Sequence, residues 1–121
     1  MAVTAITAVK SPDVNALSGK ITMTAATVAA DGFVCDFDGK DYKTAFIVEN
    51  TNNSATKTIT IKAGDSKRAS ANDLVFSLKK EETYFFTLDS ALFKKVTGAT
   101  AGKVLITPES TDIKIAVIEL T

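Results

Sequence analysis

Apolar and polar residues alternate along most of the chain in short runs, a pattern that predicts β-strands. The clearest run, Lys57 to Ala63, places Thr58 and Thr60 on one face and Ile59 and Ile61 on the other. Threonine, valine, isoleucine and phenylalanine are frequent in these runs, and such residues suit the pleated surface of a sheet. The other runs that predict strands are Ile21 to Val28, Gly32 to Phe37, Lys43 to Asn50, Asp73 to Lys80, Glu82 to Leu88, Lys103 to Glu109 and Ile113 to Leu120.

Turn residues separate these runs at a spacing of about ten residues, which is typical of a sandwich or barrel. We therefore expect an all-β, antiparallel β-sandwich of seven to eight strands, Ig-like or jelly-roll-like. One short helical turn is expected near residues 89–95, where Asp89 or Ser90 can cap it and Leu92 and Phe93 tuck under it. The predicted core consists of Phe46, Val48, Ile59, Ile61, Leu74, Phe76, Leu78, Phe86, Leu88, Val104, Ile106, Ile115 and Val117.

The first 12 residues are predicted to be an N-terminal arm or an edge strand, and residues 13–121 a single β-sandwich domain. The run Met1 to Lys10 is β-prone and carries the apolar residues Val3, Ile6 and Val9. Pro12 follows it, and proline cannot donate a hydrogen bond to a sheet ladder. As an arm, the segment would place these three side chains against a neighbouring copy, for example in a homotrimer, or against another assembly partner. As an edge strand, it would belong to its own domain.

The stretch Cys35 to Tyr42, CDFDGKDY, gathers three aspartates and a glycine and raises the question of a calcium loop. A helix-loop-helix calcium site places glycine sixth and glutamate twelfth. Counted from Asp36, the glycine is fourth and the twelfth residue is Ile47. We expect instead that Asp38-Gly39 forms a tight hairpin turn between two strands. A weak surface cation site is the alternative.

Composition argues against several function classes. Fourteen basic and fourteen acidic residues cancel, whereas a dedicated nucleic-acid binder normally has a basic excess. The chain has no histidine, the commonest general base and metal ligand. Cys35 is the only cysteine, and we interpret it as a small half-buried strand residue rather than a nucleophile. We therefore predict no catalytic residues, no metal or cofactor site and no enzyme activity.

The N-terminus lacks the basic region and continuous apolar stretch of a signal peptide. No later run approaches the length needed to span a bilayer. We accordingly expect a protein made and folded in a cytoplasm, with neither nucleic acid nor membrane as its partner.

The segment Asp73 to Leu120 carries a series of structural motifs. They are Asp73-Leu74 at the start of a strand, Asp89-Ser90 with Phe93, Gly98, Gly102-Lys103-Val104 and a final strand ending Glu119-Leu120. Upstream, Phe46 to Asp65 adds a strand, an Asn-rich loop, a strand and an Ala-Gly-Asp exit. This pattern resembles small virion proteins encoded in the structural gene clusters of tailed phages and prophages. The chain departs from it at LKKEET, where the family has a proline- or glycine-bearing turn.

The resemblance implies a structural role without catalysis. Among these virion proteins, the chain is most similar to an auxiliary capsid, or head decoration, protein. Such a protein binds the outside of an assembled head. The implied partner is the major capsid protein, the implied location is the capsid surface of the virion in a bacterial host, and self-association is compatible with it. A tail or head-completion component is the alternative within the virion. A non-catalytic binding module for carbohydrate or a cell surface is the alternative outside it.

Overall fold

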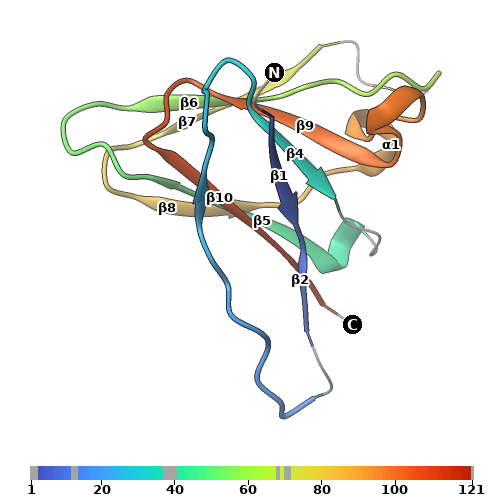
Figure 1. Ribbon diagram of the computed structural model, residues 1–121, viewed down its shortest axis with the longest axis horizontal. Coiled ribbons are helices and arrows are strands. Elements are labelled where there is room, and N and C mark those ends of the chain that lie inside the picture. Colours follow the sequence, from blue (N-terminus) through green and yellow to red (C-terminus); the bar gives the residue numbers. More distant parts are fainter. Residues whose placement is uncertain (1–2, 12–13, 37–40, 68, 70–71, 121) are drawn as a thin grey trace.

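The computed structural model describes residues 3–11, 14–36, 41–67, 69 and 72–120. In these residues the chain forms two five-stranded sheets that pack as the two layers of a β-sandwich (Figure 1). The first sheet has the order β1 (Thr4–Thr7), β4 (Phe33–Asp36), β9 (Lys103–Pro108), β6 (Lys57–Ile61) and β7 (Leu74–Leu78). The second has the order β2 (Val9–Lys10), β10 (Ile113–Glu119), β5 (Thr44–Asn50) and β8 (Thr83–Phe86), with β3 (Thr24–Ala25) also paired to β10.

The predicted all-β sandwich is confirmed, but its sheets are mixed rather than wholly antiparallel. β1 pairs in parallel with β4, and β2 pairs in parallel with β10. The other described pairings are antiparallel. The strand count exceeds the prediction because the N-terminal segment adds the two short strands β1 and β2.

The core lies between the two sheets, where alternate residues of each strand meet. In β5, Thr44, Phe46, Val48 and Asn50 are buried and the residues between them are half-exposed. Most of the predicted core is buried; Leu74, Phe76 and Phe86 are only partly buried and pack against it. Further core residues came from positions that the predicted core did not include: Ile6, Ala26, Phe33, Cys35 and Ile113.

The hairpin predicted around Asp38-Gly39 is wrong, because its two flanking strands belong to different sheets. β4 pairs with β1 and β9, whereas β5 pairs with β10 and β8. Residues 37–40 lie outside the described residues, and a 3₁₀ turn at Asp41–Lys43 leads into β5. A turn signal in the sequence carries no information on which strands pair.

Two other connections also cross between the sheets instead of forming hairpins. The Asn-rich loop joins β5 of the second sheet to β6 of the first, and the turn Lys79 to Glu82 joins β7 of the first sheet to β8 of the second. Glu81 has φ 58° in this turn, a left-handed conformation that glycine adopts most readily. Among the described strands, β6 and β7 are the consecutive pair that share a ladder.

The strand predicted from Ile21 to Val28 is reduced to β3, Thr24–Ala25. β3 pairs with Lys114 and Ile115 of β10, while β2 pairs with Ile118 and Glu119 on β10. Since β5 covers β10 along its full length, β2 and β3 share its other edge. The part of this β10 edge that β2 leaves free is long enough only for the short strand β3.

The expected helical turn is present as α1, Ser90–Phe93, followed later by a 3₁₀ turn at Gly98–Thr100. Asp89 caps α1 by accepting a hydrogen bond from the Ala91 N–H at 2.9 Å. The Asp41 carboxylate accepts another from the Ser90 N–H at 3.0 Å, which joins the start of β5 to the helix. Phe93 is buried beneath the turn, as the capped pattern predicted.

The N-terminal segment serves as an end strand of both sheets. Thr4–Thr7 pairs with β4, the Ala8 N–H donates to the Asp36 carbonyl at 3.2 Å, and Val9–Lys10 then pairs with β10. Ile6 is 5% exposed and belongs to the core cluster. Of the two alternatives drawn from the sequence, the structure has the edge strand.

Candidate functional site

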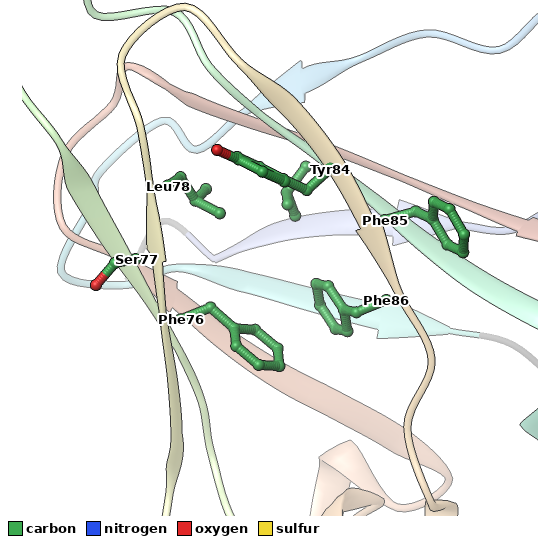
Figure 2. Close-up of a pocket in the computed structure, with 7 residues that line it drawn as sticks. Phe76, Ser77, Leu78, Tyr84, Phe85 and Phe86 are labelled. Atoms are coloured by element: carbon green, nitrogen blue, oxygen red, sulfur yellow. The ribbon is translucent and has the colours of Figure 1, made fainter.

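The side of the sandwich formed by β7 and β8, here called the open side, contains an apolar slot of about 190 Å³. β7 ends the first sheet and β8 ends the second. Figure 2 shows Phe76 and Phe86 directed toward one another across the slot, with Leu78 and Tyr84 further along it, while Ser77 and Phe85 point away. The slot therefore exposes the rim of the core between two strand edges.

Aromatic packing fixes the walls of the slot. The rings of Phe46 and Phe86 stack with centroids 5.1 Å apart and an interplanar angle of 5°. Phe76 meets Phe86 at the same centroid distance with a tilt of 54°. Such arrangements stabilise aromatic pairs beyond their area of contact. Packed aromatic rings at the edge of the core therefore form the walls of the slot, which is not a gap between loops.

Both backbone edges of the open side face outward. The Asn50 N–H donates to the Glu82 carbonyl, in the same register that pairs Phe46 with Phe86. Alternate residues of an antiparallel strand direct their backbone groups to the same neighbour. The N–H and C=O groups of Thr83 and Phe85 therefore point away from β5, toward an edge that no described strand covers.

The same reasoning applies to β7. The Lys62 N–H donates to the Leu105 carbonyl across the β6–β9 ladder, so Ile59 and Ile61 turn their backbone groups toward β7. Their partners on β7 are Phe76 and Leu74. The intervening residues of β7, such as Val75, direct their backbone groups outward. No charged side chain occurs within either edge strand, although edge charges are a common protection against strand pairing.

The outer face of the second sheet carries an apolar hollow of about 360 Å³. Its lining includes Ala45, Ile47, Phe85 and Ile118. Ile47 is the ladder partner of Phe85 on β8, and Ala45 is the partner of Ile118 on β10, so the four side chains adjoin across three strands. Phe85 is 75% exposed. A contiguous apolar patch on a sheet face marks a surface that contacts another molecule.

On the open side, the pKa of Tyr84 is shifted by a hydrogen bond. Its hydroxyl donates a hydrogen bond to the Glu82 carboxylate. This bond holds the phenol proton, and the pKa of Tyr84 is raised above its ordinary value. The phenol is a donor fixed at the rim of the slot, beside the turn that enters β8.

Asn50 is a buried polar residue that ties the two sheets together next to the open side. Its side-chain amide donates to the carbonyls of Leu78 at 2.9 Å and Ala55 at 3.1 Å, and its oxygen accepts from the Asn52 N–H at 3.0 Å. Asn52 in turn donates to the Asp112 carboxylate at 2.9 Å. Asn50 and Asn52 belong to the Asn-rich loop predicted from the sequence. Their hydrogen bonds link β5, β7 and the β9–β10 turn.

Two aspartates fix the long connection between β6 and β7. The Asp65 carboxylate accepts from the Val96 N–H and the Thr97 hydroxyl, and the pKa of Asp65 is lowered chiefly by the Thr97 bond. The Asp73 carboxylate accepts from the Ala63 N–H at 2.8 Å, which lowers the pKa of Asp73. Both groups prefer the ionised form because backbone and hydroxyl donors satisfy it.

Cys35 is fully buried in β4, deeper than the half-buried position expected from the sequence. Burial raises the pKa of its thiol to about 12. The thiol is therefore protonated near neutral pH, and the thiolate is the reactive form of cysteine. Among the described residues, no group of three or more acidic or cysteine side chains is placed to hold a metal ion.

The residues predicted for assembly are separated by the fold. Val3 is 39% exposed beside β1, Ile6 is in the core, and Val9 is half-buried on β2. The sequence pattern treated them alike because it could not show which face of β1 meets the core. Phe85 and Tyr84 were missed as surface residues, since their apolar run ETYFFTL is typical of a buried strand.

The connection between β2 and β3 leaves the body of the sandwich (Figure 1). Its residues 16–23, here called the projecting segment, form no strand or helix, and Leu17 is 94% exposed. No backbone hydrogen bond joins residues 16–23 to the rest of the described chain. The molecule thus presents two apolar features at its surface, the open side and this segment. Ser18 and Ile21 of the segment line a hollow together with Val9 and Ile118 of the sandwich.

Comparisons with protein-family models, curated proteins and solved structures found no match to the chain. In the described part of the chain, no helix combines the length and apolar character needed to cross a membrane.

Proposed function

We propose that the protein is a structural component of a tailed-phage virion that binds the outer capsid surface and stabilises the head as a decoration protein. The observation that carries the proposal is the apolar outer face of the second sheet, with Ala45, Ile47, Phe85 and Ile118 around one hollow. A soluble domain rarely exposes such a face without a partner. The resemblance of Asp73 to Leu120 to small virion proteins supplies the kind of partner.

The mechanism needs no chemistry. A head that holds packaged DNA gains strength when a rigid domain bridges neighbouring capsid subunits. The sandwich is rigid because its core is packed between two sheets and its loops are fastened by Asn50, Asp65 and Asp73. Equal numbers of basic and acidic residues limit the repulsion between many copies on one shell.

Co-sedimentation with expanded empty heads of the encoding phage or prophage tests the proposal. The wild-type protein is expected to sediment with the heads. Phe85→Lys places a charge in the apolar face and should weaken binding by about tenfold or more, because a desolvated apolar contact of this size is lost. Val75→Lys adds the same charge on the other sheet, where Val75 is 55% exposed, and should leave binding unchanged.

Wild-type protein that stays in the supernatant at saturating concentration would overturn the proposal. Equal binding by wild type and Phe85→Lys would keep a capsid role but reject the second sheet as the contact face. The position of the gene next to a major capsid gene is an independent check.

A carbohydrate-binding module is the second candidate, and Phe85 is the observation that favours it. An aromatic side chain that is 75% exposed on a sheet face can stack on a sugar ring. Sugar recognition also requires polar groups beside the ring. Thr83 and Tyr84 belong to the lining of the hollow, but its other side chains are apolar. Glycan-array binding that Phe85→Ala abolishes, together with no head binding, would favour this candidate.

A further inference from the structure

The closed side of the sandwich shows how this fold completes its edges. There, one extended segment, Thr4–Lys10, runs along both sheets, pairs with β4 and then with β10, and inserts Ile6 into the core. On the open side, β7 and β8 also end the two sheets, but no described segment pairs along their outer edges. Their outward backbone groups and the apolar slot between them fit an added strand with alternating apolar side chains.

We infer that the open side binds the projecting segment of a second copy of this chain. The segment, residues 16–23, has the sequence ALSGKITM. Leu17, Gly19, Ile21 and Met23 occupy one face of an extended chain, and Ala16, Ser18, Lys20 and Thr22 the other. Paired along β8, the segment places its apolar face in the slot and extends the second sheet by one strand.

The size of the contact fits a weak, concentration-dependent association. Leu17 is 94% exposed in the single chain. Phe85 points away from the slot, so a segment seated there covers the exposed parts of Tyr84 and Phe86. The buried area is then below the roughly 1,000 Å² of a stable interface.

The charge of the segment is compatible with this occupant. Lys20 is the only charged residue of the projecting segment. It lies on the face opposite Leu17 and Ile21, so the face that enters the apolar slot carries no charge.

The positions of the two features determine the form of the assembly. The projecting segment leaves the sandwich between β2 and β3, at the β10 edge, whereas β8 is the opposite edge of the second sheet. Each copy therefore gives its segment to one neighbour and receives a segment from another. Such a head-to-tail contact closes into a ring, for example a trimer, or continues as a chain of copies. This inference does not rest on the proposed capsid role.

Sedimentation equilibrium of the full chain, over a concentration series without heads, tests the inference. We expect wild type to associate beyond a monomer. Thr83→Pro removes an outward N–H from β8 and should weaken association by about tenfold or more, while Thr83→Ala keeps the N–H and should associate as wild type does. Leu17→Asp should weaken association similarly, while Ala16→Asp, on the other face of the segment, should not.

A disulfide trap identifies the contact directly. Cys35 is buried, so cysteines introduced in Ser18→Cys and Thr83→Cys are the reactive ones. The double variant should form a ladder of cross-linked multimers under oxidation, and each single variant should not. Thermal melts establish that every variant is folded.

Three outcomes would overturn the inference. Wild type that is monomeric throughout the series excludes a second copy as occupant. Association that survives both Thr83→Pro and Leu17→Asp places the contact elsewhere. Dimers in place of a ladder show a symmetric contact. If wild type is monomeric but Thr83→Pro abolishes head binding, the open side takes a capsid segment instead, and the proposed function stands while this inference fails.

Discussion

The two sides of the sandwich differ in how their strand edges are completed. On the closed side, Thr4–Lys10 joins the ends of both sheets and brings Ile6 into the core. On the open side, β7 and β8 end the sheets without a further strand, and Phe76 and Phe86 stay partly exposed. In this fold, the edge of a sheet can be completed by an added strand. On one side that strand belongs to the chain itself, and on the other we propose that it comes from another molecule.

The largest expected effect is on the closed side. Ile6→Ala should lower the free energy of unfolding by about 2–5 kcal/mol, because it removes a buried side chain and leaves a cavity between the sheets. Urea denaturation measures the change, and Val14→Ala, at a position 89% exposed, is the matched control. A loss below about 1 kcal/mol would show that the N-terminal segment is an arm rather than part of the core.

A smaller effect is expected on the open side. Phe76→Ala removes an aromatic ring that is only partly buried, so the dilute protein should lose about 1–3 kcal/mol of unfolding free energy. The same substitution should weaken association, because the ring lines the slot. A loss equal to that of Ile6→Ala in dilute monomer, with association unchanged, would mean that the two sides do not differ as described.

The smallest effect on stability is expected from a cysteine reporter on the open side. Ser77→Cys replaces an outward-facing hydroxyl on β7 and should change stability by less than about 0.5 kcal/mol. Its thiol should react with a thiol reagent at a rate that rises with pH toward the ordinary cysteine pKa of about 8.5. Cys35, whose pKa burial raises to about 12, should react only when the sandwich opens.

The labelling rates of the thiol introduced at position 77 and of Cys35 compare the open side with the buried strand β4 within one molecule. Mass spectrometry after labelling under native conditions measures both rates. Rapid native labelling of Cys35 would contradict the buried position of β4.

The sequence pattern predicted the strands whose alternation is strong. Ile59 and Ile61 on β6, and Phe46 and Val48 on β5, are buried as their period of two requires. The pattern could not predict pairing, because a turn residue such as glycine occurs whether the next strand joins the same sheet or the facing one. Hence the hairpin expected between β4 and β5 became a crossing between sheets, and the connections from β5 to β6 and from β7 to β8 cross as well.

The candidate site was less predictable for a related reason. Tyr84, Phe85 and Phe86 form one apolar run, and alternation within it gives no sign that β8 lies at a sheet edge. Ile6 and Val3 looked equivalent until the register of β1 against β4 placed one of them in the core. Edge position and register depend on the whole sheet, so local pattern does not encode them.

Amide hydrogen exchange at β8 measures directly whether a second copy covers the edge of the open side. In dilute protein, the outward N–H groups of Thr83 and Phe85 should exchange quickly, while those of Tyr84 and Phe86, bonded to β5, should be protected. At concentrations where the chain associates, exchange at Thr83 and Phe85 should slow strongly and exchange at Tyr84 and Phe86 should change little. Association that leaves Thr83 and Phe85 as exposed as before would contradict the account of the open side.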